Sequence, residues 1–93
     1  MHAVIGTIEI DENRADEATE LLNSFAVPNA KQAPGFISGT WYRSADGTRG
    51  HSVVLFESEA TAKAAAERVA QGPPPGAPVR LVSTDVFEVL AQA

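Results

Sequence analysis

The chain has 93 residues, a formal net charge of −5, two histidines and no cysteine. This length suits one small domain, and the missing cysteine excludes disulfides and zinc-thiolate sites, while two histidines alone do not make a structural zinc site. The basic residues are scattered, which argues against a nucleic-acid or anionic-membrane surface. No apolar run approaches the roughly 20 residues of a membrane span and no signal peptide is evident, so we expect a cytoplasmic protein.

The first third of the chain predicts a strand followed by a helix. Residues 2–10 are rich in β-branched side chains, which is typical of a strand. Apolar residues recur at helical spacing over residues 14–27, and acidic residues are enriched in the first turn, where the helix dipole favours them. Because proline lacks an N–H and clashes with the preceding turn, Pro28 should kink or interrupt this helix before Pro34 and Gly35 end it.

A β-hairpin is predicted next. Residues 36–43 and 50–57 have strand-like patterns. Asp46 and Gly47 between them favour a type I′ turn, which needs positive φ at both central residues. With this turn, three cross-strand pairs are expected: Ser44 with Arg49, Tyr42 with His51, and Trp41 with Ser52.

The last third predicts a second helix and a final strand. Ser58 is a suitable N-cap for a helix over residues 58–72, which carries a stripe of alanines and ends at Gly72. Residues 79–91 then predict a strand. The order βαββαβ with right-handed crossovers predicts a ferredoxin-like α+β sandwich: one domain over residues 1–93, with a four-stranded antiparallel sheet and both helices on one face.

Apolar residues occupy both faces of most predicted strands. With strict alternation, each of these strands has apolar pairs on opposite faces. In the second strand Ile37 and Trp41 are opposite Phe36 and Tyr42; in the third, Val54 and Phe56 are opposite Val53 and Leu55; in the last, Leu81 and Phe87 are opposite Val82 and Val86. An antiparallel sheet exposed to water on one side should be polar there. Since two helices cover one face only, we expect a second copy of the chain to cover the other, giving a homodimer.

These elements resemble a known superfamily. The helix end APGF (33–36), the strand ISGTWYRS (37–44) and the passage HSVVLFESEATAKAAA (51–66) are similar to the dimeric α+β barrel superfamily, and more narrowly to its antibiotic biosynthesis monooxygenase-like (ABM-like) domains. The resemblance covers essentially the whole chain and implies a ferredoxin-like fold that pairs into an α+β barrel. Members include cofactor-independent oxygenases of quinol-like or polyketide substrates, haem-degrading enzymes and small proteins of no known activity.

The resemblance does not supply a catalytic set. The understood enzymes of the family typically combine a Trp with a strand Asn and add His, Tyr or Arg. In this chain the three asparagines, Asn13, Asn23 and Asn29, lie in or beside the first predicted helix. His51 lies on a predicted strand, whereas the haem-degrading pattern takes its His from a helix. Candidates must therefore come from this chain's own residues, and we expect no cofactor and no metal.

Three residues are candidates for catalysis. Trp41 and Tyr42 are neighbours on one strand, so only one of them can face the dimer interior. Trp41 either bounds an aromatic substrate or is a large core residue, and Gly39 on its face leaves a gap for a ligand or a closely packed helix. His51, expected near Tyr42, either accepts a proton from a substrate or is simply solvated near the sheet rim.

Three further residues are candidates for ligand binding. Thr40 is expected beside His51 and Tyr42. Arg43, next to the hairpin turn, either attracts an anionic ligand or keeps the hairpin end hydrated. Asp85 interrupts the apolar run of the last strand and either bonds across the dimer, marks a bulge or is a buried acid.

Two hypotheses about function remain open. The first is a cofactor-independent monooxygenase that acts on a small aromatic or quinol-type molecule inside the barrel. The second is a non-catalytic dimer that binds a small molecule or has a structural or regulatory role. The first predicts a mostly apolar, closed cavity of at least roughly 300 Å³ with Trp41 or Tyr42 on its wall. A barrel packed solid with side chains would favour the second.

Overall fold

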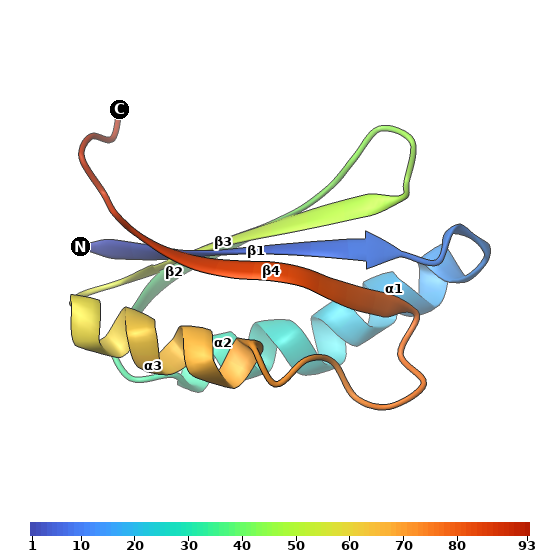
Figure 1. Cartoon of the computed structure of the whole chain (residues 1–93), viewed down its shortest axis with the longest axis horizontal. Helices are drawn as coiled ribbons and strands as arrows, with labels where there is room; N and C mark the ends of the chain where they lie inside the picture. Colours follow the sequence, from blue (N-terminus) through green and yellow to red (C-terminus); the bar gives the residue numbers. More distant parts are fainter.

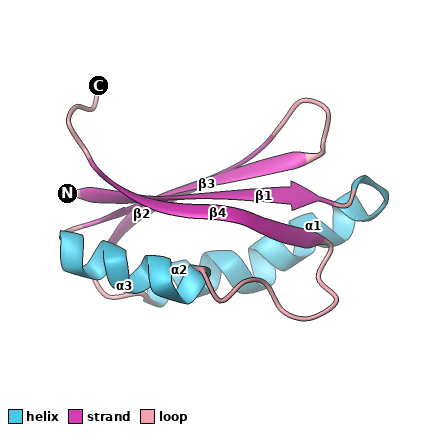
Figure 2. Ribbon diagram, viewed as in Figure 1, coloured by secondary structure: helices cyan, strands magenta, loops and turns pink.

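All helices of the chain lie on one side of a single twisted sheet (Figure 1). The computed structural model describes all 93 residues. Its strands are β1 (His2–Ile10), β2 (Phe36–Arg43), β3 (Arg49–Phe56) and β4 (Val79–Glu88), and its α-helices are α1 (Ala15–Leu21), α2 (Val27–Gln32) and α3 (Glu59–Val69). The strands are ordered β2-β3-β1-β4 and every neighbouring pair is antiparallel (Figure 2). The predicted ferredoxin-like α+β fold is confirmed.

The first helical region is continuous but changes its pitch before Pro28. A 3₁₀ turn (Glu12–Arg14) leads into α1, then a π-helical segment (Leu22–Ala26) and α2, which carries Pro28 in its first turn. The N–H of Val27 donates to the carbonyl of Leu22, five residues earlier. A wider π turn makes room for a pyrrolidine ring that would clash with a regular α-turn. The interruption of the helix that Pro28 predicted is therefore the π-helical segment Leu22–Ala26.

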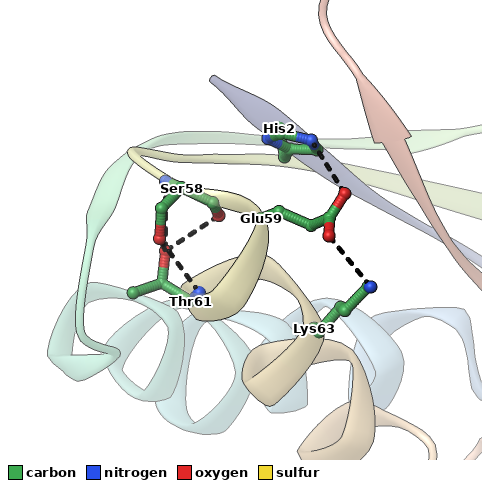
Figure 3. A network of polar contacts seen from close by, with 5 residues as sticks. All are labelled: His2, Ser58, Glu59, Thr61 and Lys63. Atoms are coloured by element: carbon green, nitrogen blue, oxygen red, sulfur yellow. Dashed lines mark hydrogen bonds and ion pairs between the residues drawn. The ribbon is translucent and has the colours of Figure 1, made fainter.

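The start of α3 is fixed by a reciprocal cap and by contact with Gly35. Ser58 Oγ accepts the N–H of Thr61 at 3.2 Å, and Thr61 Oγ1 accepts the N–H of Ser58 at 3.3 Å (Figure 3). Gly35 has φ +76°, and a Cβ there would lie 2.6 Å from Thr61 Oγ1. Its carbonyl accepts the N–H of Glu57 at 2.9 Å. The APGF segment thus serves to dock the end of the first helical region against α3.

A second group of contacts ties α3 to the start of β1. Glu59 Oε1 accepts a hydrogen bond from Lys63 Nζ at 3.0 Å, one turn along the helix, and Glu59 Oε2 lies 3.5 Å from His2 Nε2 (Figure 3). The lysine ammonium, through this hydrogen bond, holds the pKa of the Glu59 carboxyl below its usual value. His2 therefore has a place in the structure, between the start of β1 and the first turn of α3.

The hydrophobic core lies between the sheet and α3. Its buried members are Val4, Val54, Phe56, Ala62 and Ala65. Phe56 is the largest fully buried side chain, and the two alanines allow the helix to approach the sheet closely. Further side chains pack around this cluster: Ala33, Phe36, Trp41, Ala66 and Val86.

Two irregularities in strand register change which side chains share a face. In β2 Ile37 is an extra residue between paired neighbours, so Phe36 packs on the helix side together with Trp41. In β4 a similar shift puts Leu81 and Phe87 on opposite faces. The prediction that Trp41 opposes Phe36, and that Leu81 and Phe87 share a face, is therefore wrong. One extra residue reverses the alternation beyond it.

The hairpin turn is not the predicted type I′. Gly47 has φ +77°, but no non-glycine residue has a positive φ, so Asp46 does not have the backbone conformation that a type I′ turn requires. The Gly47 N–H donates to the Ser44 carbonyl at 2.9 Å, and the Ser44 N–H donates to the Arg49 carbonyl at 2.8 Å. The predicted register is nevertheless confirmed, with Tyr42 opposite His51 and Trp41 opposite Ser52.

Candidate functional site

The two faces of the sheet have different surroundings. The helix face, which carries Val4, Val54 and Trp41, lies under the helices (Figure 2). The open face carries the alternate side chains of the strands. No helix covers this face (Figure 2). Because successive strand residues point to opposite sides, the register of the four strands fixes which side chains lie next to each other on the open face.

The open face is arranged in rows that cross the strands in the order β2-β3-β1-β4. The first, called here the polar row, consists of Tyr42, His51, Thr7 and Ser83; the second of Thr40, Val53, Ile5 and Asp85; and the third of Ser38, Leu55, Ala3 and Phe87. The central strands contribute most of the apolar side chains of the second and third rows, and Phe87 adds one on the edge strand β4. We call Ile5, Val53 and Leu55 the apolar floor. The open face thus has an apolar centre with polar groups along one end and along the β2 side, while the β4 side carries Asp85 and Phe87.

A charged row lies beyond the polar row. Glu9 is opposite Arg49 on one side and Arg80 on the other. Arg80 Nη2 donates to Glu9 Oε1 at 2.6 Å. This hydrogen bond, with the attraction of the guanidinium, lowers the pKa of Glu9 below its usual value. The end of the open face therefore carries an ion pair that remains charged at neutral pH.

Within the polar row, His51 is held by one of its two ring nitrogens. Thr7 Oγ1 and His51 Nδ1 are 3.2 Å apart. No hydrogen bond within the chain involves Nε2 of this ring, and the side chain is exposed. Tyr42 is opposite His51 on the outer side and is 56% exposed. The row therefore offers a phenol, an imidazole nitrogen and two hydroxyls to whatever lies over this face.

The structure brings four of the six candidates onto the open face. Tyr42, His51 and Thr40 lie together on β2 and β3. Asp85 lies in the same row as Thr40 but on the opposite edge strand, three strand spacings or about 14 Å away. It is exposed in the single chain, and it pairs regularly with Ile5. Within one chain Asp85 is therefore neither buried nor at the β4 irregularity, and bonding across a dimer is the alternative that stays open.

Trp41 and Arg43 lie on the helix face, away from these four. A Cβ on Gly39 would lie 2.6 Å from Cη2 of Trp41, so the indole covers Gly39. The gap expected beside Gly39 is filled by the Trp41 ring. Arg43 Nη2 donates to Thr19 Oγ1 of α1 at 3.0 Å. These two residues consequently contribute to packing between the sheet and the first helical region.

Neither of the two main surface hollows of the chain is an enclosed cavity on the open face. One lies at the adjoining ends of β1 and β4 and is lined by residues 9–11 and 77–80; the other lies against Thr19, Glu20, Asn23 and Ser24. A chamber over the apolar floor therefore needs a second wall. No group of three or more His, Asp or Glu side chains is arranged to hold a metal ion. None of the helices is long and apolar enough to cross a membrane.

Thr7 and Ser83 are members of the polar row that the sequence did not single out. Alternation along residues 2–10 puts Thr7 on one face with Ala3 and Ile5, and the structure has the same arrangement. It did not show that Thr7 would lie between His51 and Ser83, because that depends on the register of three strands. Isolated threonines and serines on strands give no distinguishing signal.

Solved structures match the chain over nearly its whole length, although no protein-family model and no curated protein sequence match it. The haem degrader MhuD from Mycobacterium tuberculosis, solved with two haems bound, has a TM-score of 0.70 and 20% identity, covering 100% of this chain and 99% of MhuD. The monooxygenase ActVA-Orf6 from Streptomyces coelicolor, in complex with Nanaomycin D, has a TM-score of 0.63 and 18% identity, covering 99% and 89%. SnoaB, a cofactor-independent oxygenase from Streptomyces nogalater, has a TM-score of 0.65 and 13% identity, covering 98% and 95%. The chain therefore has the fold of the ABM-like proteins, as the sequence motifs predicted.

Proposed function

We propose that two copies of the chain pack open face to open face and that the enclosed space is the active site of a cofactor-independent monooxygenase. Its substrate is a small aromatic or quinol-type molecule. The observation that carries the proposal is the juxtaposition, on an uncovered sheet face, of the apolar floor with the polar row that contains Tyr42 and His51. An apolar surface with a few convergent polar groups is the usual composition of a small-molecule site.

The exposed apolar surface supports the dimer. Tyr42 is 56% exposed and Phe87 is 50% exposed, and both lie on the open face beside the half-buried floor. A domain of this size buries only about 60–65% of the surface of its unfolded chain, so covering a further apolar face is a substantial gain. A two-fold axis would bring the same face of each copy together.

The dimer can be tested by sedimentation of the wild type and two matched variants. Val53→Asp puts a carboxylate in the centre of the apolar floor, and we expect it to weaken dimerisation on the order of 100-fold or more because the charge is buried without a partner. Val69→Asp makes the same change on α3, where Val69 is already exposed, and should leave the dimer intact. A wild-type chain that remains monomeric at high concentration would contradict the proposal.

The polar row supports proton transfer. A neutral imidazole near neutral pH can take a proton from a substrate hydroxyl, and the Tyr42 phenol, the neighbour of His51 in the row, can donate to the resulting oxyanion. Deprotonation makes a quinol a better electron donor to dioxygen. In the net reaction a quinol and O₂ give a hydroxyquinone and water: one ring C–H becomes C–OH, the two quinol hydroxyls become quinone carbonyls, and the second oxygen atom leaves as water. The substrate thus supplies all four electrons and no external reductant is needed.

The matching structures support oxygen chemistry on this fold, since ActVA-Orf6, SnoaB and MhuD are described as a monooxygenase, an oxygenase and a haem degrader. One observation favours the alternative, a dimer that binds a small molecule without changing it. No asparagine lies on a strand, whereas the understood enzymes that the chain resembles typically use one. The two functions share the chamber and differ in whether His51 has a chemical role.

Oxygen uptake in the presence of a panel of quinols and phenols distinguishes the two functions. We expect uptake by the wild type and a loss on the order of 100-fold in kcat for His51→Gln, the range for removal of a general base. His2→Gln is the matched control, because the other histidine of the chain contacts Glu59 near α3. Binding of a panel member without any oxygen uptake would favour the non-catalytic function, and equal uptake by wild type and His51→Gln would exclude His51 as the base.

A further inference from the structure

The contact between Thr7 and His51 joins the two central strands of the sheet on the open face. The two residues are direct cross-strand partners, and Thr7 Oγ1 lies 3.2 Å from His51 Nδ1. Central strands are flanked on both sides by neighbours, so the backbone that carries the pair is held more firmly than an edge would be. The contact therefore sets the orientation of the ring relative to the apolar floor.

The chemistry of the two groups defines two arrangements of the proton. A neutral imidazole carries one N–H and one lone pair, while a threonine hydroxyl can donate or accept. If Nδ1–H donates to Thr7 Oγ1, Nε2 has a free lone pair and can accept a proton. If the hydroxyl donates to Nδ1, then Nε2 carries the hydrogen and can only donate. Only the first arrangement serves a base, and only the first keeps its hydrogen bond after the ring is protonated.

The surroundings of Thr7 allow the first arrangement in the protein without a substrate. Ser83 flanks Thr7 on the other side in the same row. The only side-chain hydrogen bond of Thr7 Oγ1 within the chain is the one to His51, so this hydroxyl is free to accept from Nδ1–H. Along β1, Ile5 and Thr7 are two residues apart, which is about 7 Å in a strand. A molecule of aromatic size can therefore cover the floor while its hydroxyl group reaches the polar row.

We propose that Thr7 is a positioning residue that holds His51 in its Nδ1–H tautomer, so that Nε2 accepts the proton of a substrate with an apolar body and an ionisable hydroxyl at one end. The substrate part of this inference rests on the proposed function. The tautomer part does not, because the tautomer is a property of the protein itself. The role of Thr7 is thus testable without a substrate.

The test is nitrogen NMR of isotope-labelled imidazole rings at mildly alkaline pH, where histidine is neutral. Three variants are compared with the wild type. Thr7→Val keeps the shape of the side chain but removes the hydroxyl, and Thr7→Ser keeps the hydroxyl. Thr84→Val is the matched control: it also replaces a threonine by valine, but on the neighbouring strand β4, where the Thr84 hydroxyl is buried on the helix face without a partner. His2→Gln identifies which signals belong to His51.

We expect the wild type, Thr7→Ser and Thr84→Val to show mainly Nδ1–H, and Thr7→Val to shift His51 toward Nε2–H. With a substrate that the protein oxidises, Thr7→Val should also lower kcat about tenfold, and Thr7→Ser should restore most of it. Identical nitrogen signals in the wild type and Thr7→Val, or an Nε2–H form in the wild type, would overturn the role of Thr7. A tautomer shift without any oxygen uptake would support the role of Thr7 and count against the proposed function alone.

Discussion

The helix face and the open face are built from the same four strands, yet only one of them is filled by the chain itself. Along β3, Phe56 on the helix face is 1% exposed, while its neighbour Leu55 on the open face is half-buried. On the helix face the alanines of α3 let the helix come close and complete the core. The comparison shows that apolar side chains on a strand need not belong to the core of their own chain.

The largest expected effect is a difference in the free energy of unfolding between two adjacent substitutions, one on each face of the sheet. Phe56→Ala should lower the free energy of unfolding by roughly 3–5 kcal/mol, since it opens a cavity in the core. Leu55→Ala should cost about 1 kcal/mol in the monomer, because a half-buried side chain loses less contact. Urea unfolding at two protein concentrations measures both.

Concentration dependence makes this comparison sharper. If the open face is buried in a dimer, the cost of Leu55→Ala should increase as the protein concentration is raised. The cost of Phe56→Ala should stay large at every concentration. A loss from Leu55→Ala that equals that of Phe56→Ala in dilute, monomeric protein would contradict the division into a filled and an unfilled face.

A smaller effect, of opposite sign, is expected for a threonine on each face. Thr84→Val on the helix face removes a buried hydroxyl that has no partner, and we expect a gain of up to about 1 kcal/mol in the free energy of unfolding. Thr40→Val on the open face changes an exposed hydroxyl and should have almost no effect on the monomer. Thermal unfolding of both variants checks the difference, and a destabilised Thr84→Val would mean that this hydroxyl has a role the core requires.

The smallest effect lies in the hairpin turn, which belongs to neither face and provides a baseline. Asp46 Oδ1 accepts hydrogen bonds from the Ser44 hydroxyl, the Thr48 N–H and the Thr48 hydroxyl, which lower the pKa of Asp46 from 3.8 to about 2. Because the folded-state pKa is depressed, the stabilisation is present above the unfolded value and is lost as the pH falls toward 2. The stability difference between wild type and Asp46→Ala should therefore shrink between pH values of about 4 and 2. A difference that does not change with pH would show that the ionised carboxylate is not what stabilises the turn.

Much of the fold could be predicted because its causes are local. The alternation of residues 2–10, the cap at Ser58 and the break at Pro28 each depend on a few neighbouring residues, and all three appear in the structure. The prediction of a type I′ turn was wrong, because the three hydrogen bonds to Asp46 outweigh the preference of an Asp-Gly pair for positive φ.

The candidate site was less predictable because it depends on contacts between strands. Tyr42 and His51 could be placed together, since they flank one short turn. Alternation alone could not show whether Trp41 or Tyr42 would lie under the helices. It assigns the two residues to opposite faces, but since both faces are apolar it does not say which face the helices cover. The irregularity at Ile37 reverses the alternation from Phe36 onward without any mark in the sequence. The pairing of Thr7 with His51 requires the register across the chain, which no short motif encodes.

The position of the Trp41 ring over Gly39 has an optical consequence. The chain's one tryptophan lies on the helix face and its one tyrosine, Tyr42, lies on the open face. Tryptophan fluorescence therefore reports on the core alone, and tyrosine absorbance reports on whatever covers the other side. The molecule carries a separate intrinsic chromophore for each face, so unfolding and the covering of the open face can be followed in one sample without a label.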